Sequence, residues 1–212
     1  MPRPLRRVLL RGAAAAALVF GAAMPAPAVM TTVTNDTGSS NYQLVLRVGS
    51  AVGVDTVSFS VTGNNVAINP AQVTGTPDID VWVLPLRPAG NTTTSRPVSL
   101  TVDSSGGMAC QSGGCGATVI PFSKVSWAAS NNGAASSGDI QSGTFTGSAA
   151  QQIASFEANT TYCSIPFIFW CFGWAYQTQQ LNQTRMRFFY ANDVIYPAGT
   201  YTGTVRFTAT MQ

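Results

Sequence analysis

Hydrophobic and polar residues alternate along several short segments of this chain. The closing segment shows it best: from residue 201 to 211 most odd positions are apolar, and the even positions are threonine apart from Arg206. Successive strand residues point to opposite faces of a sheet, so the pattern predicts a strand with one face on a core and one in water. The same alternation recurs at residues 42–48, 57–61, 79–84, 98–103, 125–127 and 185–190.

Clusters of Gly, Pro, Asn and Ser separate these segments. They lie at residues 63–65, 88–91, 104–107, 131–133 and 197–199. These residue types favour turns, and short alternating strands between turns predict an all-β sandwich or barrel. No segment predicts a long helix. The Ser-, Gly- and Ala-rich stretch 129–150 is interpreted as loops around a short strand at residues 143–147, rather than as a linker.

The first 28 residues have the three parts of a secretory signal. Four arginines precede an apolar stretch from Ala13 to Ala23, and Ala26-Pro27-Ala28 has the small-x-small pattern of a cleavage site. The alternative is a retained membrane anchor, but this stretch is well short of the roughly 20 residues that span a bilayer. We therefore expect cleavage after Ala28, with residues 29–212 forming a single domain.

Removing the signal changes the charge of the chain. The full sequence has 11 basic and 8 acidic residues, a net charge of +3. Four of the basic residues lie in the signal, so the remainder has seven basic and eight acidic residues, a net charge of −1. Phosphate binding needs clustered Lys and Arg, so we expect no nucleic-acid partner. The scarcity of charge and the abundance of Thr, Val, Tyr and Phe favour strands over helices.

The four cysteines form two close pairs in the sequence. Cys110 and Cys115 have four residues between them, and Cys163 and Cys171 have seven. In an exported chain an even number of cysteines predicts disulfides. Three connectivities are possible, and we favour 110–115 with 163–171 because each closes a local loop. A zinc site is the alternative, but its usual spacing and any histidine are missing.

The sequence lacks the residues on which most enzyme mechanisms depend. It has no histidine, which excludes Ser-His-Asp and Cys-His arrangements. Asp78 and Asp80 lie two residues apart, on one face of a strand, where they could form a weak calcium site. We favour the simpler interpretation that they are solvated charges. We expect no catalytic residue, no cofactor and no metal site.

The end of the chain carries a family resemblance. Residues 196–210 read Tyr-Pro-Ala-Gly-Thr-Tyr-Thr-Gly-Thr-Val-Arg-Phe-Thr-Ala-Thr. This resembles the last strand of bacterial fimbrial subunits, including the spore-coat-U-like and other chaperone–usher pilins. Gly199 is 14th from the end, like the glycine of the pilin motif, whereas Met211 stands where pilins often have an aromatic residue. The resemblance covers about 20 of the 184 residues that follow the signal.

The resemblance implies a fold and a mode of assembly. Pilin domains are immunoglobulin-like antiparallel β-sandwiches that lack one strand. A periplasmic chaperone lends that strand, and at an outer-membrane usher the N-terminal extension of a neighbouring fimbrial subunit replaces it, which is β-strand addition. In this chain the acceptor groove would be lined by Tyr201, Val205, Phe207 and Met211. The alternative, that these are core residues of a complete sandwich, stays equally open.

The segment after the predicted cleavage site is a poor donor strand. Within residues 29–41 the apolar residues are Val29, Met30 and Val33. This composition indicates either a tip subunit, which donates to no neighbour, or a self-complete domain.

A second candidate surface is the aromatic run Cys163-Ser-Ile-Pro-Phe-Ile-Phe-Trp-Cys-Phe-Gly-Trp174. If the cysteines pair, the run is a stapled loop. Exposed, it is a hydrophobic finger that presses into a surface, lipid or partner pocket; buried, it is a core strand, and we favour the buried form. The candidate surface-binding residues are Phe167, Phe169, Trp170, Phe172 and Trp174.

These observations predict a non-enzymatic structural and adhesive subunit of a fimbrium or pilus. It would pass through the periplasm to the cell surface and contact a host or abiotic surface. The alternative is a self-contained secreted module that binds a glycan or a hydrophobic surface.

Overall fold

The computed structural model describes residues 30–33, 43–51, 53–62, 66, 71–86, 95–178 and 181–212. For residues 30–33, 159–161 and 174–178 it describes the backbone alone. The predicted signal lies outside this part of the chain, and its cleavage stays a prediction. Within the described ranges, no helix is long and apolar enough to cross a membrane.

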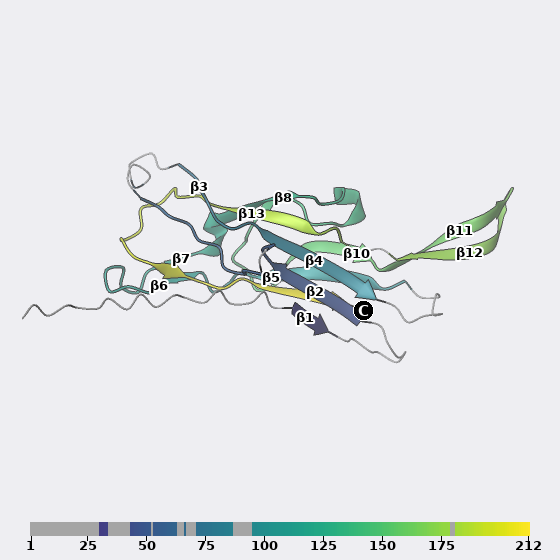
Figure 1. The fold of residues 1–212 in the computed structure, drawn as a ribbon, viewed down its shortest axis with the longest axis horizontal. Coiled ribbons are helices and arrows are strands. Elements are labelled where there is room, and N and C mark those ends of the chain that lie inside the picture. The colour runs from purple at the N-terminus through teal and green to yellow at the C-terminus, as the bar shows by residue number, and fades with distance from the viewer. Residues whose placement is uncertain are drawn as a thin grey trace, which may run out of the picture.

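The chain is nearly all β, and its antiparallel sheets form a sandwich that is compatible with the predicted immunoglobulin-like class (Figure 1). The larger sheet has seven strands in the order β1-β2-β4-β13-β8-β9, with β3 also paired to β13. Its strands are β1 (Met30–Val33), β2 (Gln43–Gly49), β3 (Val73–Thr74), β4 (Ile79–Leu86), β8 (Val125–Ser130), β9 (Gly143–Thr144) and β13 (Thr184–Tyr190).

A three-stranded sheet of order β10-β5-β15 forms the second layer. Two smaller units complete the fold, a β14-β6-β7 sheet and a hairpin of β11 and β12. The bounds are β5 (Pro97–Asp103), β6 (Met108–Cys110), β7 (Val119–Ile120), β10 (Gln151–Glu157), β11 (Asn159–Phe167), β12 (Trp170–Thr178), β14 (Tyr201–Thr202) and β15 (Arg206–Met211). Among the residues that the structure describes, Phe122–Lys124 and Ala135–Ser137 each form a short 3-10 helix.

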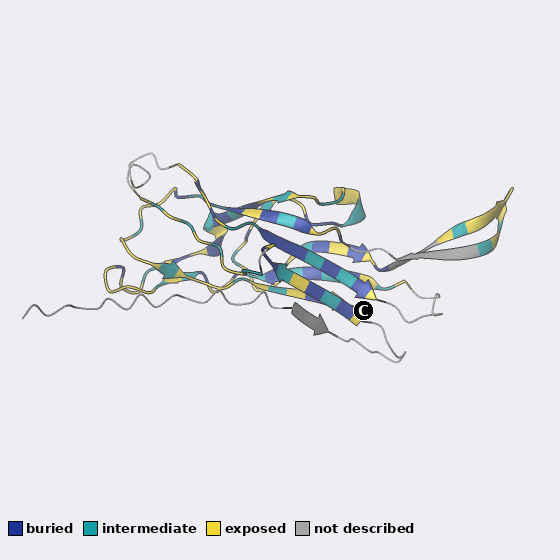
Figure 2. Cartoon of the chain, in the orientation of Figure 1, coloured by how far each residue is buried: buried dark blue, intermediate teal, exposed yellow. Residues whose placement is uncertain are grey.

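The core lies between the two layers. Along β5 the apolar positions Val98, Leu100 and Val102 are fully buried, whereas Ser99 and Thr101 are only partly buried. Val81 and Val83 of β4 are equally inaccessible. Burying one such side chain stabilises the fold by about 1.5–3 kcal/mol, so alternation along central strands of both sheets fixes how they pack. Figure 2 shows this buried layer in dark blue along the middle of the sandwich.

Two predicted strands differ from the structure. Residues 57–61 form only an isolated bridge, Ser58 with Thr76, although Val57, Phe59 and Val61 do pack against the core. Alternation there reports one-sided burial without a hydrogen-bonded ladder.

The segment 201–211, predicted as one strand, is two strands in different sheets: β14 pairs with β6, and β15 pairs with β5. Gly203 lies at the break. A Cβ atom at Gly203 would collide with the carbonyl oxygen of Gly107 and with the ring of Phe122, so only glycine allows this backbone approach.

Candidate binding surfaces

The β11–β12 hairpin projects away from the sandwich (Figure 1). Its register closes on the pair Phe167 and Trp170, so the connecting turn consists of Ile168 and Phe169 alone. Nine residues in each strand, at about 3.3 Å per residue, give the hairpin a length of roughly 30 Å. Such a reach places the turn well beyond the packed body.

The end of the hairpin is apolar and open to solvent. Phe169 is 90% exposed, Ile168 79%, Trp170 76% and Phe172 73%. Phe167, the remaining predicted surface residue with a described side chain, is 57% exposed. The favoured interpretation of this run as a buried core strand is therefore wrong, because no other described element covers it (Figure 2). The side chain of Trp174 lies outside the described part.

The disulfide predicted within this run is present. Cys163 and Cys171 are joined, with a Cα–Cα distance of 5.7 Å, and they link the two strands of the hairpin. Phe167 and Phe172 meet edge to face with ring centroids 5.7 Å apart, a geometry that stabilises aromatic pairs. The link and the ring contact hold the exposed end in one shape without a core beneath it.

Ile168 adopts an unusual backbone conformation at the turn. Its φ is +39°, in the left-handed region that β-branched residues rarely occupy. A glycine or asparagine would relieve this strain, which is of order 1–3 kcal/mol. Ile168 is unfavourable for the turn conformation and, at 79% exposed, does not contribute to a core.

The base of the hairpin is anchored in the body on both sides. Ala158 and Leu181 are each 2% exposed. The Ala158 amide donates to the carbonyl of Arg96 at 2.8 Å, and the Leu181 amide donates to that of Val83 at 3.3 Å. Beyond Leu181, the buried carboxylate of Asp139 accepts hydrogen bonds from the Asn182 amide and the Thr184 hydroxyl. The base of the hairpin is therefore fixed to the body, while its tip is exposed to solvent.

The predicted groove residues do not form one surface. Met211 is 1% exposed, whereas Val205 and Phe207 are partly buried and pack against the core. Tyr201 lies in β14, in another sheet, where its hydroxyl donates to the Pro197 carbonyl at 2.7 Å. Among the described strands β15 pairs with β5 alone, so its other edge has no strand partner within this part of the chain.

The turn that carries the family resemblance packs on the other disulfide, Cys110–Cys115, which also matches the favoured connectivity. A Cβ atom at Gly199 would collide with the sulfur of Cys115. The Gln111 amide donates to the Thr200 carbonyl at 2.7 Å. The loop closed by this disulfide therefore supports the start of the closing segment, a role that sequence analysis did not assign to it.

Asp78 and Asp80 are paired with arginines, which corrects the view that both are solvated charges. Asp80 is buried and binds Arg185, with Oδ1 to Nε at 2.9 Å. Asp78 binds Arg187 through both oxygens at 2.9 Å, and this hydrogen-bonded guanidinium lowers the pKa of Asp78 below its usual value. No group of three or more potential metal ligands occurs among the residues that the structure describes.

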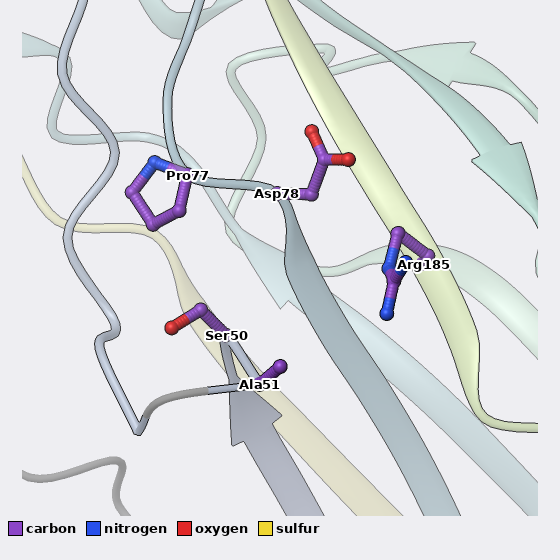
Figure 3. Close-up of a pocket in the computed structure, with 5 residues that line it drawn as sticks. All are labelled: Ser50, Ala51, Pro77, Asp78 and Arg185. Atoms are coloured by element: carbon purple, nitrogen blue, oxygen red, sulfur yellow. The ribbon is translucent and has the colours of Figure 1, made fainter.

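A shallow hollow lies beside these pairs, lined by Ser50, Ala51, Pro77, Asp78 and Arg185 (Figure 3). The end of β2 forms one wall, and β4 and β13 form the other. Both charged groups already have a partner across the β4–β13 pairing, so the hollow offers no free charge to a ligand. Sequence analysis missed this pairing because it depends on the register of two strands that lie far apart in the chain.

Comparisons with models of protein families, with curated proteins and with solved structures find no match for this chain. The two disulfides fit folding in an oxidising compartment outside the cytoplasm.

Proposed function

We propose that this chain is a non-enzymatic, adhesive surface subunit of the fimbrial type, which joins a neighbouring subunit by strand complementation at β15. The observation that carries the proposal is the outer edge of β15, along which no other described strand pairs. An open sheet edge presents free backbone donors and acceptors, which an added strand satisfies. The pilin resemblance of the same segment supports this assignment.

The packing of β15 limits which of its side chains an added strand could cover. Met211 and Ala209 are buried already, so an added strand would gain most from Val205 and Phe207. The larger sheet runs close to β15 at β2, and β1 borders β2 on the same sheet. In this arrangement the incoming strand lies along β15 and covers the partly buried side chains, while a chaperone and an usher deliver it.

The N-terminal segment supports a terminal position in the assembly. Met30–Val33 forms β1 and pairs with β2 of its own chain. A segment that already pairs within its own chain is not free to complement a neighbouring subunit. The subunit therefore accepts a strand without donating one, as a tip subunit would, and carries its adhesive hairpin outward.

A self-contained secreted binding module is the second candidate. The complete burial of Met211 favours it, since this end of β15 needs no added strand. The two candidates predict different behaviour of the exported chain in isolation. A complemented subunit gains stability when a synthetic donor-strand peptide or its chaperone is added. A monomer that unfolds cooperatively and reversibly, with a midpoint unchanged by the peptide, would overturn the fimbrial proposal.

A further inference from the structure

We propose that the tip of the β11–β12 hairpin inserts into the interface of a lipid bilayer. The inference names the target of the adhesive part of the proposed function. It depends on the hairpin alone and does not require that β15 accept a strand.

Polarity changes in order along the hairpin. The turn and the pairs next to it consist of Ile165, Pro166, Phe167, Ile168 and Phe169 facing Trp170–Gly173 across the register. Ser164 and the pair of Cys163 with Trp174 come next, then Tyr162, half exposed and opposite Ala175, and then Thr161 opposite Tyr176. The pairs at the base are Thr160 with Gln177 and Asn159 with Thr178.

Apart from Trp170, which lies beside the turn, this order matches the depth profile of a membrane surface. Aliphatic and Phe side chains favour the acyl region, Trp and Tyr favour the headgroup level, and amide and hydroxyl side chains favour water. The apolar end from Ile165 to the turn spans about 10 Å at the rise of a strand, comparable with the depth to which interfacial segments bury. A pocket in a protein would impose no such gradient over the length of the finger.

The absence of charged residues in the hairpin favours a target that is bound without ionic contacts. Residues 158–184 contain no Asp, Glu, Lys or Arg, so the whole finger is uncharged. An uncharged tip loses no ionic hydration when it enters lipid, and salt does not screen its binding.

The backbone limits insertion to the interface. A two-stranded hairpin has two outer edges with unpaired amides, so it cannot cross the hydrocarbon region. Pro166 removes one donor near the tip. Proline on an edge also obstructs pairing with another strand, which disfavours a second copy of this chain as the occupant.

A glycan is disfavoured for a different reason. Sugar recognition combines aromatic stacking with several hydrogen-bonding side chains, as specific sites for polar ligands require. From Ile165 to Phe169 the tip has no polar side chain. Insertion into lipid gives the strained, exposed Ile168 a role, because its side chain is an additional aliphatic group at the leading end of the hairpin.

The test is co-flotation of the exported chain with neutral phosphatidylcholine vesicles, at low and high salt. If the chain requires its chaperone to stay folded, the complex is floated instead. We expect salt-independent binding that falls about tenfold or more in Phe169→Ser, since burial of one Phe contributes on that scale. Ile195→Ser is the matched control, because Ile195 is 68% exposed but lies on the body, and it should float like the wild type.

Three results would overturn the proposal. These are a folded wild type that does not float, a Phe169→Ser variant that floats normally, and binding to alkyl-coated beads without binding to vesicles. If the wild type ignores vesicles but dimerises in analytical ultracentrifugation through Phe169, a second copy is the occupant and lipid is not. None of these results bears on the peptide-dependent stability that tests β15, so the two proposals fail separately.

Discussion

The sandwich and the hairpin use similar residues in opposite ways. In the sandwich Leu100 and Val102 face another sheet and are fully buried, whereas in the hairpin Phe169 and Trp170 face solvent and are at least three-quarters exposed. Burial of apolar surface stabilises the sandwich, whereas the hairpin keeps its apolar surface in contact with water. A large exposed apolar patch is typical of a contact site, so the difference in exposure supports the proposed division, with stability in the sandwich and binding in the hairpin.

The comparison predicts its largest effect for one pair of substitutions. Leu100→Ala should lower the free energy of unfolding by about 3 kcal/mol, because it removes buried methyl groups and leaves a cavity. Phe169→Ala should change that energy by less than about 0.5 kcal/mol, as exposed positions do. Urea denaturation of the two variants measures both. Equal destabilisation would mean that the hairpin end packs on the sandwich in solution.

The junction between the two regions depends on a buried carboxylate. Asp139 accepts hydrogen bonds from the amides of Gly133 and Ile140 as well as from residues that follow β12. Asp139→Ala would leave buried donors unsatisfied, so we expect a loss of about 2–3 kcal/mol in the same denaturation experiment. The exposed Asp55→Ala is the control and should be near neutral. Similar midpoints for the two variants would show that Asp139 does not anchor this region.

Acid titration acts on the sandwich, since residues 158–184, which include the hairpin, contain no Asp, Glu, Lys or Arg. Hydrogen bonds from Arg187 and Ser105 lower the pKa values of Asp78 and Asp103 below 3.8. Their contribution to stability is therefore present above about pH 4 and is lost as pH falls through the lowered values.

At the alkaline end, burial raises the pKa of Tyr190 to about 12 from 10.0. Tyr190 ionises first in the unfolded chain. Its contribution to the free energy of unfolding is therefore complete below pH 10 and is lost as pH rises towards 12. Denaturation midpoints across pH should show both declines. Tyr190→Phe should remove part of the alkaline decline, and an unchanged alkaline profile would contradict this assignment.

The smallest global effect should come from the hairpin disulfide. The paired change Cys163→Ser with Cys171→Ser removes a constraint worth about 2–3 kcal/mol to the local order of the loop that it closes. The unfolding midpoint of the sandwich should stay nearly constant, while proteolysis within residues 163–171 becomes faster. The matched pair Cys110→Ser with Cys115→Ser should lower the midpoint, because that loop supports Gly199 and Thr200. The reverse ranking would exchange the roles of the two loops.

Sequence alone predicted most of the sandwich and little of its surfaces. Alternation identified β2, β4, β5, β8 and β13, because one-sided burial against a second sheet imposes a period of two. It could not show the break at Gly203, which arises from contact with Gly107, distant in the chain.

The hairpin shows a second limit. A strand buried on both faces and an exposed finger have the same apolar composition, so the residues of 163–174 do not distinguish them. Their exposure depends on what other elements leave uncovered. The Arg185–Asp80 pair was hidden for a related reason: the two residues are 105 positions apart and meet only through the β4–β13 register.

Hydrogen–deuterium exchange of the isolated and assembled chain tests the division between a joining edge and a binding finger most directly. We expect assembly to increase amide protection along β15, at residues 206–211, and to leave exchange in the hairpin at 162–173 unchanged. Full protection of β15 in the isolated monomer, or new protection that appears in the hairpin instead, would contradict it.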